Sequence, residues 1–121
     1  MSGIRGHVLI IEDEMLIALE IESLLGDLGF ETFDIADNPA SALASAVAHR
    51  PDLITADVRI IGGTGVEAVR AIRATLGPVP VVFVMGNVDE LMNQDPFVLV
   101  EKPITARALA TACDWACAQA A

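Results

Sequence analysis

Five short apolar runs alternate along this chain with segments whose apolar residues recur at helical spacing. The runs predict strands over residues 7–12, 33–35, 53–57, 81–85 and 97–100. The first run is unbroken, which is typical of a strand buried on both faces. Strands that alternate with helices form parallel sheets, and right-handed crossovers place helices on both faces of such a sheet. The chain is therefore predicted to have an α/β fold with a doubly wound five-stranded parallel sheet.

The segments between the strands carry the start and stop signals of helices. Helices are predicted over residues 15–28, 39–48 and 64–76, and a last one begins at Thr105. Asn38 and Pro39 are typical of an N-cap and a first helical position, and Gly29 and Gly77 follow two helices where helices often end. These signals place a helix after each of the first three strands and after the fifth.

The connection between the fourth and fifth strands is different. Only thirteen residues separate Met85 from Leu99, and four of them disfavour a helix interior, namely Gly86, Asn87, Asn93 and Pro96. The fourth helix of the fold is therefore predicted to be short or irregular.

Length and charge limit the classes of protein to which the chain can belong. Its 121 residues suffice for a single domain over 1–121 with a real core, and 54% apolar residues are too many for a disordered chain. No apolar run approaches the roughly 20 residues of a spanning helix. Seventeen acidic against seven basic residues give a net charge of −10, which opposes binding to nucleic-acid phosphates and anionic lipid. We expect a cytoplasmic protein without direct nucleic-acid binding or membrane insertion.

The cysteines, histidines and clustered glycines show no ligand-binding pattern in the sequence. Cys113 and Cys117 stand four residues apart in an alanine-rich segment and are predicted to be small apolar residues on one helix face. His7 and His49 have no matching partners and are predicted to lie at the surface or at a strand start. The GGTG segment at 62–65 lacks the lysine of a phosphate-binding loop and is predicted to be a plain flexible loop.

Charged residues follow three of the predicted strands at the point where each strand ends. The first strand is followed by Glu12, Asp13 and Glu14, the third ends in Asp57, and Lys102 comes after the fifth. The carboxyl ends of parallel strands meet at one edge of the sheet, where ligands bind in such folds. Carboxylates that gather there repel one another unless a cation joins them, and a site with few protein carboxylates suits Mg²⁺. We therefore expect Mg²⁺ or another divalent cation at this edge.

Asp57 is the natural nucleophile of this edge, because it stands alone at its strand end whereas Glu12 and Asp13 form a pair suited to a metal. A carboxylate beside a divalent cation and a lysine is equipped to receive a phosphoryl group, since both cations neutralise charge on the transferring oxygens. The sequence thus predicts phosphoryl transfer to Asp57 with help from Lys102.

The segments LIIEDE, LITAD and EKPI resemble, in this order, those of the receiver domain of two-component response regulators, and the likeness covers essentially the whole chain. The resemblance implies the flavodoxin-like strand order 2-1-3-4-5. It also implies that Asp57 accepts phosphate from a sensor histidine kinase or a histidine phosphotransferase. The implied ligands of Mg²⁺ are Asp13, Asp57 and the backbone carbonyl of Arg59, with Glu12 in support. Lys102 is implied to contact the phosphoryl oxygen.

Two positions depart from the family pattern. Met85 ends the fourth strand, where the family usually has a Thr or Ser whose hydroxyl bonds the phosphoryl group. A thioether donates no hydrogen bond, so a contact worth roughly 1.5–3 kcal/mol is missing. Leu99 occupies a second switch position that often holds Tyr or Phe, so an aromatic rotamer switch is absent. Apart from Met85, residues 83–86 resemble the Phe-Ala-Thr-Gly signature of a receiver subfamily with a shortened fourth segment.

Two functions remain open at this point. The first is a stand-alone phosphoacceptor domain, without a separate output domain, whose state a protein partner reads; it would act as a relay, a phosphate sink or a switch. The second is a receiver-like module that binds its partner without phosphate, which Met85 and Leu99 favour. The last helix with Trp115 offers a face for a partner or a homodimer, although core packing is the commoner use of such residues. We expect no enzyme, beyond promotion of its own phosphorylation and dephosphorylation.

Overall fold

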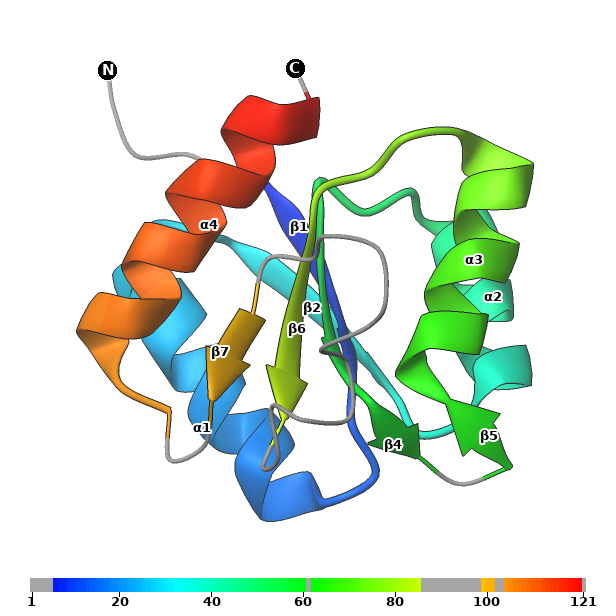
Figure 1. Cartoon of the computed structure of the whole chain (residues 1–121), viewed down its shortest axis with the longest axis horizontal. Coiled ribbons are helices and arrows are strands. Elements are labelled where there is room, and N and C mark those ends of the chain that lie inside the picture. Colours follow the sequence, from blue (N-terminus) through cyan, green and yellow to red (C-terminus); the bar gives the residue numbers. More distant parts are fainter. Residues whose placement is uncertain (1–5, 61, 86–98, 102–103, 121) are drawn as a thin grey trace.

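The structure, a computed structural model, describes residues 6–60, 62–85, 99–101 and 104–120 (Figure 1). The strands are β1 (His7–Ile11), β2 (Thr32–Ala36), β3 (Leu53–Asp57), β4 (Arg59–Ile60), β5 (Gly63–Thr64), β6 (Val81–Met85) and β7 (Leu99–Glu101). The helices are α1 (Met15–Asp27), α2 (Pro39–Ala48), α3 (Gly65–Leu76) and α4 (Ala106–Ala120).

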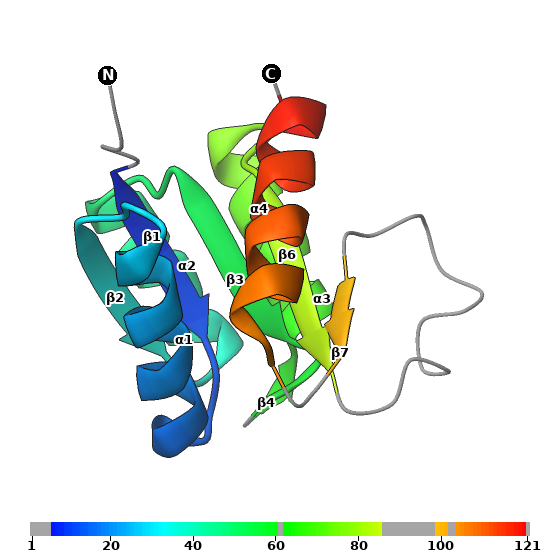
Figure 2. The ribbon, with the colours of Figure 1, turned by 90° about the vertical axis from the view of Figure 1, so that its left-hand side faces the viewer.

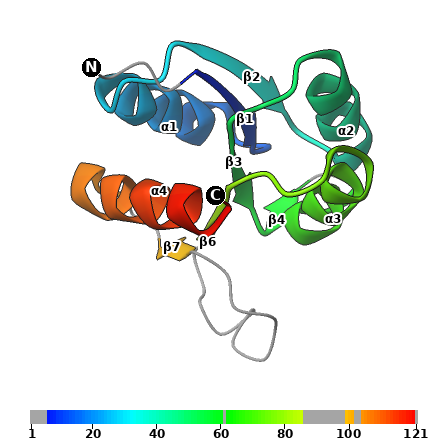
Figure 3. The same ribbon diagram turned by 90° about the horizontal axis from the view of Figure 1, so that it is seen from above.

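Within the described residues, the main sheet has five parallel strands in the order β2-β1-β3-β6-β7. Counted along this sheet's own strands, that is 2-1-3-4-5, so the predicted doubly wound α/β fold is confirmed. Seen from above, α1 and α4 cover one face of the sheet, and α2 and α3 cover the other (Figure 3). Figure 2 shows the same layers from the side of α1 and α4.

Two cores lie on the two faces of the sheet, and they explain the unbroken apolar run of β1. Its alternate residues Leu9 and Ile11 pack in the cluster under α2 and α3, whereas Val8 and Ile10 pack in the cluster under α1 and α4. All four side chains are almost completely buried. A central strand of this kind needs apolar residues at every position because both of its faces are covered.

The ends of the helices follow the predicted signals. Asn38 caps α2, since its Oδ1 accepts a hydrogen bond from the Ser41 backbone N–H at 2.9 Å, and Pro39 is the first helical residue. Thr105 precedes α4, and its Oγ1 accepts from the Ala108 N–H at 3.1 Å. Gly77 follows α3 with a φ of 87°, a left-handed conformation that favours glycine.

The GGTG segment is more ordered than the sequence predicted. Strands β4 and β5 form a two-stranded antiparallel hairpin, with Gly62 at a φ of 79° in the turn. Thr64 then caps α3 in a capping box with Glu67: the Glu67 N–H donates to Thr64 Oγ1 at 3.1 Å, and Glu67 Oε1 accepts from the Thr64 N–H at 3.0 Å. The prediction of a plain flexible loop was wrong, because a turn and a helix cap hold this segment.

Two further predictions concern residues 86–101, of which the structure describes only 99–101. The fifth strand of the sheet includes Leu99–Glu101, one residue further than the predicted end at 100. The predicted short or irregular fourth helix falls at 86–98, outside the described residues. Within the part of the chain that the structure describes, no helix is long and apolar enough to cross a membrane.

Candidate functional site

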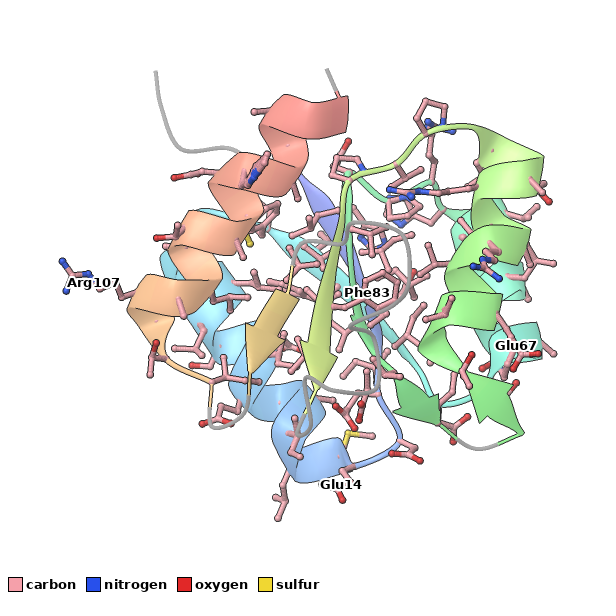
Figure 4. The ribbon with its side chains drawn as sticks, viewed as in Figure 1. Glu14, Glu67, Phe83 and Arg107 are labelled. Carbon is pink, nitrogen blue, oxygen red and sulfur yellow. The ribbon has the colours of Figure 1, made fainter. Side chains whose placement is uncertain are left out.

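The acidic residues after β1 and at the end of β3 come together beyond the carboxyl ends of these neighbouring strands. Ile11 pairs with Ala56 in the sheet, so the next residues, Glu12 and Asp57, stand beside each other. Carboxylate oxygens of Glu12, Asp13 and Asp57 all lie within 4.8 Å of one another. Figure 4 shows the labelled Glu14 at the same end of the sheet, where α1 begins. The structure therefore gathers the three acids that the sequence placed at one edge.

The three clustered acids differ in their exposure. Glu12 is 2% exposed, Asp57 is half-buried and Asp13 is exposed. Backbone contacts fix Glu12: its N–H donates to the Ala36 carbonyl at 2.9 Å, and its Oε2 accepts from the Glu14 N–H at 3.2 Å. A buried carboxylate that backbone contacts hold in place thus lies next to two more accessible ones.

This set of side chains fits a divalent cation. Three carboxylates supply the hard oxygen ligands that Mg²⁺ prefers, and few enough of them that water and a phosphoryl oxygen can complete the coordination. A cation there also offsets the mutual repulsion of the acids. When bound, Mg²⁺ neutralises charge that develops on a transferring phosphoryl group.

The segment after Asp57 is anchored by a close backbone approach at Gly65. The Gly65 N–H donates to the Val58 carbonyl at 2.8 Å. A β-carbon at Gly65 would overlap the Asp57 carbonyl oxygen and would lie 2.9 Å from the Asp57 carbonyl carbon. The first residue of α3 must therefore be glycine for the helix to reach the end of β3. The glycine-rich sequence of 62–65 predicts only a flexible loop, and the close approach at Gly65 is visible only in the tertiary structure.

The remaining predicted site residues are placed only in part. Arg59 begins β4, two residues after Asp57, and its backbone pairs with Thr64. Met85 ends β6 and Leu99 begins β7, but their side chains lie outside the described part of the chain. Lys102 lies outside it altogether. The roles predicted for these residues stay predictions.

The sheet order and the acidic cluster both match what the receiver motifs of the sequence imply. Residues 8–114 match the model of the response regulator receiver domain family, and the chain belongs to this family.

Several of the proteins that this chain resembles are described as PhyR. The chain is 35% identical over 102 residues to the phyllosphere-induced regulator PhyR of Methylorubrum extorquens. The matched segment covers 80% of this chain and 38% of that protein. The receiver domain of the Erythrobacter litoralis PhyR response regulator, solved by NMR, superposes with a TM-score of 0.82 at 32% identity and covers 91% of this chain and 88% of that one. A mutant of the anti-anti-sigma factor PhyR from Bartonella quintana gives a TM-score of 0.84 at 30% identity, over 93% and 48% of the two chains. The chain spans 22% and 38% of the length of the first two curated relatives that it matches.

The acidic cluster predicts a response of the fold to Mg²⁺. Mg²⁺ at 100 times its dissociation constant should raise the free energy of unfolding by about 2.7 kcal/mol, because the ion binds only the folded state. In Asp57→Asn the response should shrink, because the cluster loses a charged ligand. Urea unfolding of the wild type and of Asp57→Asn, with and without Mg²⁺, measures how much Mg²⁺ raises the free energy of unfolding of each protein. An equal gain in both would show that the ion binds elsewhere.

Proposed function

We propose that this receiver domain accepts a phosphoryl group on Asp57 and that a protein partner reads the phosphorylated state. The observation that carries the proposal is the position of Asp57, half-buried at the end of β3 and within 4.8 Å of the oxygens of Glu12 and Asp13. Residues 1–121 would act in this as one domain.

The donor would be the phosphohistidine of a sensor kinase or of a histidine phosphotransferase. A carboxylate oxygen of Asp57 attacks phosphorus, the bond from phosphorus to the imidazole nitrogen breaks, and that nitrogen keeps the electron pair and takes up a proton. The product is an acyl phosphate on Asp57. Asp13, Asp57 and the Arg59 carbonyl would hold the required Mg²⁺ with Glu12 in support, and Lys102 would contact a phosphoryl oxygen.

The way in which the phosphorylated state is read would differ from the usual family pattern. Met85 brings no hydroxyl to the end of β6, and Leu99 brings no aromatic ring to β7. One charged hydrogen bond is worth roughly 1.5–3 kcal/mol, while a full switch between two states needs about 5.5 kcal/mol of differential interaction. The switch here would therefore depend on contacts other than those two side chains, including contacts with the partner.

The partner is proposed to be a protein. The net charge of −10 opposes binding to nucleic acid, and one similar structure is that of an anti-anti-sigma factor, a description that points to a protein target. On α4, Trp115 is 47% exposed whereas Leu109, Cys113 and Ala116 are buried. The exposed side of α4 is thus one surface that a partner or a second copy of this chain would contact.

Intact-mass measurement tests the phosphoryl transfer directly. The wild-type chain should gain one phosphoryl group on incubation with acetyl phosphate and Mg²⁺. Asp57→Asn should gain none, and neither should the wild type when metal is omitted. Asp52→Asn is the matched control, because Asp52 lies at the opposite end of β3 and should leave the gain intact. A phosphoryl group that also appears on Asp57→Asn would contradict the assignment.

The alternative function is a receiver-like module that binds its partner without phosphate, and the residue types at Met85 and Leu99 favour it. The two functions differ in one measurable result. If Asp57→Asn binds the partner as tightly as the phosphorylated wild type, the phosphate-independent module is correct. If binding requires phosphate on Asp57, the phosphoacceptor function is correct.

A further inference from the structure

A second group of metal-ligating side chains lies at the other end of β1 from the acidic cluster. His7 is the first residue of β1, Asp34 lies on the edge strand β2, and His49 directly follows α2. One ligand atom from each of the three side chains lies within 4.8 Å of the other two. His7 begins β1 and His49 is exposed, as the sequence predicted, but the expectation that they lack partners was wrong, because their partners come from distant elements of the fold.

His7 is held in a fixed orientation. The residue is 4% exposed, its ring Nδ1 lies 2.8 Å from Thr32 Oγ1, and its Nε2 lies 3.0 Å from Asp34 Oδ2. Its backbone N–H donates to Asp52 Oδ2 at 2.9 Å. Histidines that bind metals commonly have their second ring nitrogen fixed by such a hydrogen bond. Thr32 Oγ1 lies where it would accept this hydrogen bond from Nδ1.

A cation would have to replace the contact between His7 and Asp34, whose Nε2 and Oδ2 atoms lie 3.0 Å apart, within hydrogen-bond and ion-pair distance. An ionised carboxylate only accepts hydrogen bonds, so Nε2–H donates to Asp34 while the Thr32 hydroxyl donates to Nδ1. If the ring hydrogen moves to Nδ1, which then donates to Thr32, Nε2 offers its lone pair to a cation that the Asp34 carboxylate also binds. In a tetrahedral zinc site, ligand bonds of about 2.0–2.1 Å set nitrogen and oxygen about 3.3 Å apart. The observed 3.0 Å would need to widen only slightly.

His49 would supply the third ligand after its ring turns. Its ring stacks on that of His7 with a centroid distance of 3.6 Å and an interplanar angle of 13°. Two stacked rings cannot both point an in-plane lone pair at one ion, so the ring of His49 must rotate. Its position in solvent after the end of α2 permits this rotation.

We propose that His7, Asp34 and His49 form a binding site for a Zn²⁺-class cation, with water as the fourth ligand. Two imidazoles and one carboxylate suit Zn²⁺, Ni²⁺ or Cu²⁺, whereas the all-carboxylate cluster at the other end of the sheet suits Mg²⁺. The chemistry of the ligands therefore separates the two sites. A bound ion would join the end of α2 and the edge strand β2 to β1.

A zinc titration in excess Mg²⁺ tests this site apart from the acidic one. We expect the wild-type chain to take up one equivalent of Zn²⁺ by calorimetry. The chain has only two histidines, so its imidazole NMR spectrum contains two ring systems, and both should shift as Zn²⁺ binds. Loss of even an outer partner of a metal site costs 10–100-fold in affinity, so Asp34→Asn and His49→Ala should each weaken binding by about tenfold or more.

Asp57→Asn serves as the matched control and should bind Zn²⁺ like the wild type. His7 itself is left unchanged because it is buried among three elements, and its replacement would disturb the fold. The proposal is overturned if no Zn²⁺ binds in excess Mg²⁺, if uptake shifts neither imidazole, or if His49→Ala and Asp34→Asn bind as tightly as the wild type. None of these results bears on phosphoryl transfer to Asp57.

Discussion

Gly65→Ala is expected to lower the free energy of unfolding by about 3 kcal/mol and to slow phosphoryl uptake at Asp57. The added methyl group overlaps the Asp57 carbonyl oxygen and lies 3.3 Å from the Ala56 side chain, so the start of α3 must move away from the end of β3. Insertion of atoms into a packed site typically costs 1–3 kcal/mol, and here the nearest atom is backbone that cannot turn aside. The overlap falls on the backbone of Asp57, the residue that is proposed to accept the phosphoryl group, so phosphoryl uptake should slow as well.

Gly26→Ala is the matched control for this substitution. Gly26 is exposed near the end of α1, and a β-carbon there would meet nothing within 4 Å. Alanine is the better helix residue, so this variant should gain about 0.5–1 kcal/mol. Urea unfolding gives both free energies, and intact mass against time with acetyl phosphate gives the rates of uptake. Equal stabilities of the two variants would show that the contact at Gly65 is not tight.

Phe83→Ala is expected to cost about 3–5 kcal/mol, the usual range for a large aromatic side chain removed from a core. Phe83 is 1% exposed, and it lies on β6 in the cluster under α2 and α3, where Figure 4 labels it. A typical domain has only 5–15 kcal/mol of stability, so this loss is a large part of the total. β6 is also the strand that pairs with the end of β3, since Val84 lies opposite Asp57.

Leu16→Ala provides the comparison for Phe83→Ala. Leu16 lies on α1 with 84% of its surface exposed, so its truncation should change stability by less than about 0.5 kcal/mol. Chemical unfolding monitored by circular dichroism separates the two cases. A loss below about 1 kcal/mol in Phe83→Ala would mean that the core under α3 readily refills the space.

Most of the fold was predictable because its signals are local. The unbroken apolar run of β1 marked a central strand, and Asn38 with Pro39 marked the start of α2. The acids after β1 and β3 were expected at one edge because parallel strands bring their carboxyl ends together, and the structure places their oxygens within 4.8 Å. The family was recognisable from the motifs around these acids, and the match over residues 8–114 confirms it.

The β4–β5 hairpin was less predictable. Two short strands separated by one turn do not produce a periodic pattern, and three glycines in four residues are more typical of an open loop. One signal was available: Thr64 and Glu67 have the spacing of a capping box, which marks a fixed helix start. This spacing predicts that the end of the 62–65 segment is held by the start of a helix.

The sequence by itself determined the elements, their order along the chain and the acidic edge, because hydrophobic period, helix caps and strand ends depend on near neighbours. Only the tertiary structure decided which distant side chains meet. His7 reaches Asp34 because β1 and β2 pair in one register, and it reaches His49 because α2 packs back across the sheet. Gly65 is required because α3 begins against the end of β3. Strand register and helix packing depend on contacts throughout the core, so no local sequence pattern predicts them.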